Sequence, residues 1–109
     1  VVGLGYSNGA NILAAVAMRA PHLFTDLALL HPLIPWDPDP QPGLDGARVL
    51  VTAGERDPIC PAPLTRSFVG WMSAQGAKVD THWHPGGHEI AQAEVQALAG
   101  FLADTPKPA

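Results

Sequence analysis

Three residues that together can activate a nucleophile occur along the chain in the order serine, acid, histidine: Ser7, Asp57 and His88. A serine hydroxyl is a poor nucleophile at neutral pH. It needs a base within hydrogen-bond reach, normally an imidazole that a carboxylate orients. Such a set catalyses acyl transfer, so these residues predict a hydrolytic site with Ser7 as the nucleophile. The elements around them must bring them together.

Ser7 lies in a stretch, residues 5–9, that reads GYSNG. Apolar residues precede and follow it, which indicates a strand, a sharp turn and a helix. At the apex of such a turn the backbone is strained and the hydroxyl projects above the sheet. We expect the glycines on either side to remove Cβ atoms that would clash. The free N–H groups of the helix point to the same place, where an oxyanion would form. The pattern also occurs by chance as a polar turn, but the flanking strand and helix favour the catalytic interpretation.

The base is expected to be His88, which follows the glycine pair Gly86 and Gly87. These glycines let the backbone bring the imidazole toward the serine with no side chain in the way. His84 is the alternative base, but it lies closer to its predicted strand and has no glycines before it. Serine, acid, histidine is also the order of the triad along the chain in α/β-hydrolases.

The acid is expected to be Asp57, a few residues after a predicted strand in a turn bounded by prolines. That position would present its carboxylate at the rim of a sheet, within reach of the histidine. Glu55 is an alternative acid, and Asp37 or Asp39 could come in from a long proline-rich loop.

The other histidines are assigned lesser roles. His22, near a helix end, and His82, on the polar face of a strand, are expected to be solvated. The pattern His82-x-His84 with His88 would suit a metal, but no second cluster of Cys or carboxylate accompanies it, so no metal is predicted. The residues expected to line a substrate pocket are Tyr6, His31, Trp36 and Ile59.

Four strands and three helices are predicted. The strands lie at 1–4, 27–30, 48–53 and 78–83, and the helices at about 8–19, in the segment ending near 76, and after 88. Strands that alternate with helices indicate a parallel sheet with right-handed crossovers and helices on both faces. In such sheets, sites form at the carboxyl ends of the strands, so Ser7, Asp57 and His88 share one rim.

The pattern of apolar residues predicts what is buried. The first strand reads as buried on both faces, the first helix as buried on most sides, and the fourth strand, with its polar alternation, as a charged sheet edge. The last helix is expected to bury Val95, Leu98 and Leu102 and to carry Glu94 nearer its polar side.

Composition limits the class of protein. The 109 residues, 47% hydrophobic and 15% charged, fit one globular domain over residues 1–109, with a loose tail at 105–109. A net charge of −4 with six scattered Lys and Arg argues against nucleic-acid binding. The longest apolar run is too short to span a bilayer. Cys60 is the lone cysteine and is expected to be a small buried hydrophobe rather than a nucleophile.

The sequence starts without Met, and its first residues read like the middle of a buried strand. We therefore expect that an upstream segment has been removed or that another chain covers this strand. With no leader-like segment at its start and a single cysteine, the chain is expected to be cytoplasmic.

Three segments carry a family resemblance: residues 5–11 (GYSNGAN), 54–61 (GERDPICP) and 86–88 (GGH). They resemble the phospholipase/carboxylesterase family of α/β-hydrolases, notably its hydroquinone-resistance carboxylesterase branch. The similarity covers essentially the whole chain but only the C-terminal half of that fold. It implies a truncated α/β-hydrolase domain and a serine esterase acting on short- or medium-chain acyl esters without a cofactor, with Ser7, Asp57 and His88 as its triad.

The resemblance also implies what the chain lacks. One oxyanion donor would be the backbone N–H of Asn8, and the other would come from the missing half of the fold. Losing one donor typically costs about 100- to 1000-fold in rate, so a lone monomer is expected to be a poor catalyst. A catalytically silent binding module is the alternative. Truncation would also leave the first strand with an unpaired edge, which predicts a homodimer or larger assembly.

Overall fold

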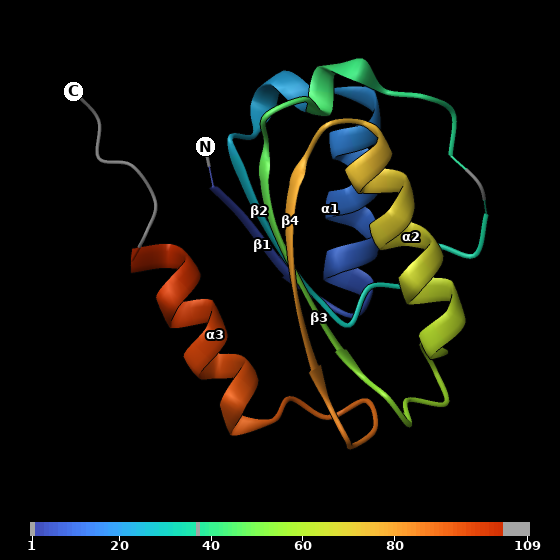
Figure 1. The fold of residues 1–109 in the computed structure, drawn as a ribbon, viewed down its shortest axis with the longest axis vertical. Coiled ribbons are helices and arrows are strands. Elements are labelled where there is room, and N and C mark those ends of the chain that lie inside the picture. Colours follow the sequence, from blue (N-terminus) through green and yellow to red (C-terminus); the bar gives the residue numbers. More distant parts are fainter. Residues whose placement is uncertain (1, 37, 104–109) are drawn as a thin grey trace.

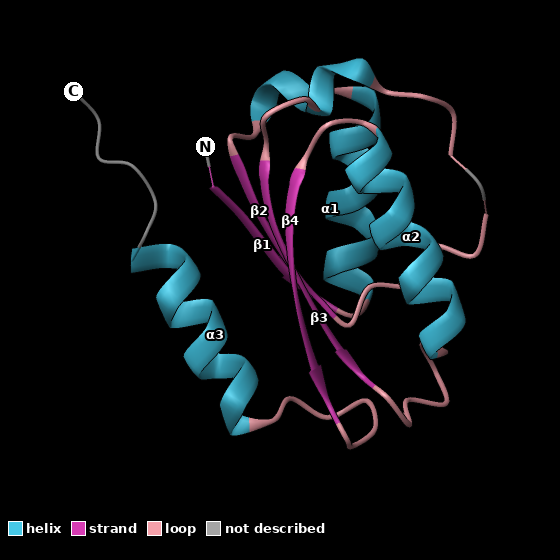
Figure 2. Ribbon diagram, in the orientation of Figure 1, coloured by secondary structure: helices cyan, strands magenta, loops and turns pink. Residues whose placement is uncertain are grey.

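A computed structural model describes residues 2–36 and 38–103. One parallel sheet has the spatial order β1-β2-β3-β4, with α1 and α2 over one face and α3 over the other (Figures 1 and 2). The strands are β1 (Val2–Tyr6), β2 (Asp26–Leu30), β3 (Arg48–Gly54) and β4 (Lys78–His84), and the helices are α1 (Asn8–Arg19), α2 (Ala62–Ala74) and α3 (Gln92–Ala103). This confirms the predicted α/β class and element order.

Short 3-10 turns at Pro21–Leu23 and Pro42–Leu44 interrupt the connections to β2 and β3. The predicted tail at 105–109 and the rival acid Asp37 lie outside the described residues. No helix within the described ranges is long and apolar enough to cross a membrane.

The two central strands hold the core. Alternate residues of β2 and β3 face opposite sides of the sheet, as the pleat requires. Leu27 and Val49 pack under α1 and α2, whereas Leu30 and Leu50 pack against Phe101 of α3. Because both faces are covered, β2 and β3 read as continuous apolar runs, and the prediction that they are buried is correct.

Burial was predicted wrongly for β1 and α1. Leu4 of β1 is 56% exposed, and Ile12 of α1 is 66% exposed. The cause lies in the packing. α3 contacts β3 and β4 and does not extend over β1, while α1 packs on the sheet through a narrow face of alanines. Apolar side chains are therefore left open to solvent at two places, on the α3 side of β1 and on the outer side of α1.

The buried face of α3 also differs from the prediction. Glu94 and Phe101 are buried, whereas Val95 and Leu102 are exposed. Positions 94, 98 and 101 recur at helical spacing, so they form the face that meets the sheet. An acidic residue occupies this face because histidines at the rim of the sheet bind its carboxylate, as described below.

The remaining boundaries follow local chemistry. α2 ends before Gly76, whose φ of +89° favours glycine, so the predicted stop is confirmed. β4 is an edge strand that pairs with β3, and it exposes Lys78 and Asp80, as its polar alternation predicted.

Candidate active site

Ser7 forms the turn between β1 and α1. Its φ of 54° and ψ of −116° place a residue with a side chain in the left-handed region, a strained conformation that costs free energy. Hydrogen bonds hold the turn. The Ser7 N–H donates to the carbonyl of Leu30 at 2.8 Å, and the Ser7 carbonyl accepts from the Asn11 N–H at 3.0 Å. The hydroxyl does not cap the helix and is free to face the rim.

The two glycines beside Ser7 differ in role. A Cβ on Gly5 would lie 2.6 Å from the backbone of Gly9, so strand and helix can approach this closely only without a side chain there. A Cβ on Gly9 would meet nothing within 4 Å. The expectation that both glycines avoid a clash is therefore correct for Gly5 and wrong for Gly9.

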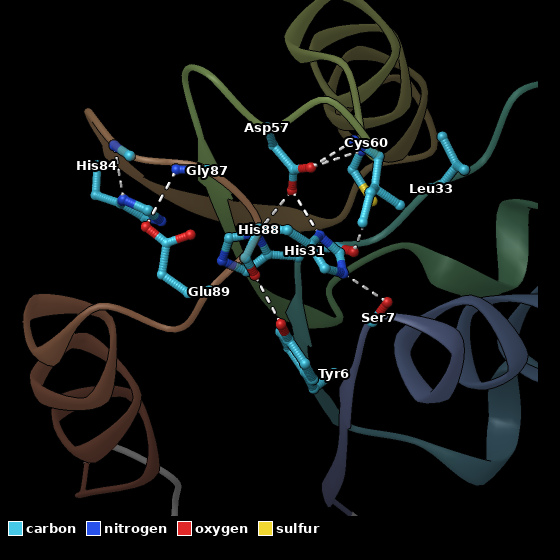
Figure 3. A network of polar contacts seen from close by, with 12 residues as sticks. Tyr6, Ser7, His31, Leu33, Asp57, Cys60, His84, Gly87, His88 and Glu89 are labelled. Atoms are coloured by element: carbon cyan, nitrogen blue, oxygen red, sulfur yellow. Dashed lines mark hydrogen bonds and ion pairs between the residues drawn. The ribbon is translucent and has the colours of Figure 1, made fainter.

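Ser7, His88 and Asp57 lie side by side at the carboxyl end of the sheet (Figure 3). The Ser7 Oγ is 2.9 Å from Nε2 of His88, and Nδ1 of His88 is 2.7 Å from Oδ2 of Asp57. The three residues follow β1, β4 and β3, respectively. The structure thus brings together the three residues selected from the sequence, in a hydrogen-bonded series.

Asp57 is buried and every oxygen of its carboxylate is engaged. Oδ1 accepts the backbone N–H groups of Ile59 and Cys60 at 2.8 and 2.9 Å, and Oδ2 faces Nδ1 of His31 at 3.1 Å as well as His88. Burial by itself raises the pKa of Asp57. The four hydrogen bonds outweigh it and lower the pKa to about 2. Asp57 is therefore an anion at neutral pH.

The loop that carries His88 is fixed from two sides. The Arg56 N–H donates to the Gly86 carbonyl at 3.0 Å, and a Cβ on Gly54 would lie 2.1 Å from the Gly87 carbonyl oxygen, so the loop fits only over a glycine. From the other side, the Tyr6 hydroxyl donates to the backbone carbonyl of His88 at 2.7 Å. Tyr6 therefore tethers the base, a contact that nothing in the sequence pattern indicated.

Comparison with known proteins shows which proteins this chain resembles. No family model matches the chain. It is 31% identical over 96 residues to "Putative hydrolase MhqD" of Bacillus subtilis (strain 168), a match that covers 88% of this chain and 48% of that protein. Its fold superposes on Atu2452 of Agrobacterium tumefaciens str. C58, a protein of unknown function, with a TM-score of 0.90 and 56% identity, covering 94% of this chain and 50% of that one.

A carboxylesterase from Bacillus cereus superposes with a TM-score of 0.84 and 29% identity, over 94% of this chain and 49% of the esterase. The chain has a truncated α/β-hydrolase fold and resembles these proteins over about half of their length. It spans about half the length of each of these relatives.

The rival bases and acids of this hydrolase fold lie elsewhere. His84 is buried, accepts the Gly86 N–H at Nδ1 and places Nε2 2.8 Å from Glu94, close enough for an ion pair but without hydrogen-bond geometry, so neither nitrogen is directed to Ser7. Glu55 and Asp39 are exposed. His82 was expected to be solvated, but it is half-buried. Its Nε2 is buried without a hydrogen-bond partner among the described residues.

The predicted pocket residues separate into two groups. Tyr6, His31 and Ile59 lie at the rim, where Ile59 also presents an exposed apolar side chain. Trp36 instead lines a hollow between the C-terminal half of α1 and the proline-rich loop, with Met18 among its neighbours. That hollow is at the opposite end of α1 from Ser7.

Cys60 is buried behind the acid, and its thiol donates to the His31 carbonyl at 3.3 Å. Burial and the negative charge of Asp57 raise the pKa of the thiol to about 11. A protonated, buried thiol is a poor nucleophile, which agrees with its predicted role.

The sequence analysis did not predict that His31 and Glu94 form a buried pair at the rim. Nε2 of His31 lies 2.8 Å from Oε2 of Glu94, and both side chains are fully buried. Glu94 also accepts the Ala91 N–H at 2.9 Å, the capping-box contact at the start of α3. The sequence signal was a glutamate three residues into the helix, in phase with Leu98 and Phe101.

Two sets of side chains bring donor atoms within 4.8 Å of one another and could in principle hold a metal: His31, Asp57 and His88, and His31, His84 and Glu94. In both sets the donor atoms already lie in pairs at hydrogen-bond or ion-pair distances of 2.7 to 3.1 Å. A metal would have to displace these pairings and the protons they require.

Proposed function

We propose that this chain carries the nucleophile, base and acid of a serine carboxylesterase. The observation that carries the proposal is the series of hydrogen bonds from the Ser7 Oγ through the imidazole of His88 to Asp57, at 2.9 and 2.7 Å. The relationship to a carboxylesterase of known structure supports the same reaction class.

The proton positions follow from the contacts. Asp57 is ionised, so it can only accept, and Nδ1 of His88 must carry the proton that it donates. In the neutral imidazole, Nε2 then accepts the Ser7 hydroxyl proton. This tautomer is the one that a general base requires.

The reaction would proceed through an acyl-enzyme. Ser7 attacks the acyl carbonyl while His88 takes its proton, and His88 then returns the proton to the leaving alkoxide. Water, activated by the same imidazole, releases the acid. Asp57 stabilises the His88 imidazolium that forms during acylation and again during deacylation. Short- to medium-chain carboxylic esters are the proposed substrates, following the resemblance to the phospholipase/carboxylesterase family, and the proposed chemistry uses no cofactor.

The backbone N–H of Asn8 is the proposed oxyanion donor. It opens α1, where the first N–H groups have no acceptor within the helix and the helix dipole favours negative charge. The second donor is proposed to lie in the part of the α/β-hydrolase fold that this chain does not span.

Exchanging Ser7 for Ala tests the proposal, with p-nitrophenyl esters of increasing acyl length as substrates. Loss of the nucleophile should lower turnover by at least about 1000-fold. Ser67→Ala, at an exposed position of α2, is the matched control and should hydrolyse the esters at the wild-type rate. Equal turnover by Ser7→Ala and wild type would overturn the proposal.

A catalytically silent binding module is the second candidate. It is favoured by one observation: the chain spans about half the length of its hydrolase relatives, and the proposed second oxyanion donor would lie in the other half. Such a module would keep the triad geometry but show no Ser7-dependent turnover.

A further inference from the structure

A second set of buried polar side chains lies directly behind the triad acid. His31 directly follows β2 and begins the next loop with a φ of 53°, a strained value for a residue with a side chain. Its ring is fully buried and spans two carboxylates: Nδ1 is 3.1 Å from Asp57 Oδ2, and Nε2 is 2.8 Å from Glu94 Oε2. The triad mechanism uses neither His31 nor Glu94.

Both carboxylates are anions. The hydrogen bonds to Asp57 hold its pKa at about 2. For Glu94, burial alone raises the pKa, but the hydrogen bonds from the Ala91 N–H, from the Thr52 side chain and from His31 outweigh it and lower the pKa below its ordinary value. The position of Glu94 in the first turn of α3, at the positive end of the helix dipole, favours the anion further.

The contacts then fix the protons on His31. An ionised carboxylate only accepts, so each ring nitrogen of His31 must donate, and the ring must carry two protons. His84 cannot take this role because its Nδ1 accepts the Gly86 N–H, which leaves one proton, on the Nε2 that faces Glu94. With two protons on the His31 ring, the cluster would hold one cation between two anions.

We infer that His31 is a doubly protonated positioning residue, held by Glu94, that fixes the Asp57 carboxylate from behind while His88 bonds it from the front. The inference rests on the proposed function for its catalytic consequence. His31 touches no reacting atom and acts only through Asp57. Glu94 in turn supplies the negative charge that keeps both protons on the His31 ring.

The groups around the His31 ring suit a doubly protonated imidazole. Tyr6, His84 and His88 surround the ring with centroids 5.3 to 5.7 Å away. Asp57 and Glu94 are the carboxylates within 3.1 Å of the ring, and the exposed Glu89 also interacts with it electrostatically, so anions flank the ring. Removing one anion would leave an uncompensated buried charge, and the ring would release a proton instead.

The consequence for catalysis is geometric. With a proton lost from His31, Asp57 would lose a donor or face a lone pair, and its carboxylate could turn. A displacement of about 1 Å in a catalytic group can cost about 100-fold in rate. Substrate binding would be unaffected because Glu94 is fully buried.

Long-range ¹H–¹⁵N NMR on the wild-type chain tests the protonation directly and needs no activity. Both ring nitrogens of His31 should carry protons between pH 6 and pH 8, whereas His84 should show a single proton on Nε2. A wild-type His31 with only one protonated nitrogen over this range would overturn the inference.

The variant Glu94→Gln tests the positioning role. We expect His31 to become singly protonated, the Nδ1–H resonance of His88 to shift, and kcat for p-nitrophenyl esters to fall by about 100-fold at constant KM. Glu55→Gln removes an exposed carboxylate and should change none of these. Circular dichroism shows whether the variant is folded. If the variant does not fold, the NMR spectrum of the wild-type chain still tests the protonation of His31.

The outcomes separate the two proposals. No Ser7-dependent turnover in the wild type would remove the proposed function, while the His31 and His88 resonances would still test the cluster. Full kcat and an unchanged His88 resonance in a folded Glu94→Gln variant would overturn the inference and leave the esterase proposal intact.

Discussion

The hydroxyl oxygen of Ser7 and Nε2 of His88 lie 2.9 Å apart although 81 positions separate them in the sequence. They follow the two edge strands of the sheet, β1 and β4, which three strand spacings put about 14 Å apart. The loop after β4 therefore has to cross the ends of β3 and β2. Gly54 leaves room for the loop, and Tyr6 binds it on the far side.

Tyr6→Phe should loosen the far end of that crossing. The substitution keeps the ring and removes the 2.7 Å hydrogen bond to the His88 carbonyl. A hydrogen bond of this kind contributes about 1 kcal/mol, so we expect Ser7-dependent turnover to fall by up to about tenfold. Ester hydrolysis measures this, and an unchanged rate would show that the loop is held without Tyr6.

Gly5→Ala and Gly9→Ala form a matched pair on either side of the nucleophile. A methyl on Gly5 must push against the backbone of α1, so we expect a loss of about 1–3 kcal/mol in the free energy of unfolding, together with loss of activity. A methyl on Gly9 meets open space, and Ala favours a helix, so that variant should stay within about 1 kcal/mol of wild type. Urea denaturation compares them. Equal costs would contradict the packing described.

Acid should destabilise the protein through Asp57. Its folded pKa of about 2 lies below its ordinary value of 3.8, so the stabilisation is present above pH 4 and is lost as the pH falls toward 2. The shift corresponds to about 2 kcal/mol. Thermal or urea unfolding at pH 5 and pH 2 should show a smaller loss in Asp57→Asn than in wild type. Parallel losses in both proteins would argue against a depressed pKa.

The free edge of β1 predicts self-association of the 109-residue chain. β1 pairs only with β2 among the described residues, and the apolar side chains of Leu4 on β1 and Ile12 on α1 are exposed. For this chain alone in solution, the available occupant is a second copy. Light scattering should report a dimer or larger assembly that Leu4→Lys weakens and Val95→Lys, at an exposed position of α3, does not. A stable wild-type monomer at micromolar concentration would refute this.

The sequence was sufficient for the features that depend on local chemistry. Glycine spacing located the turn at Ser7, and the order of strands and helices placed Asp57 and His88 on the same rim. Sequence reasoning failed where contacts with residues distant in the sequence determine which side chains are buried. Glu94 is buried where His31 and His84 contact its carboxylate, and the periodicity of α3 by itself does not predict a buried acid. Leu4 and Ile12 are exposed because no described element covers them.

Fluorophosphonate labelling of the intact chain tests the central claim most directly, because the reagent reacts with an activated serine and needs no ester turnover. We predict a single adduct on the peptide that contains Ser7, formed by the wild-type protein and lost in His88→Ala. A folded wild-type protein that takes up no label, or one in which His88→Ala labels Ser7 as fast as wild type, would contradict the account.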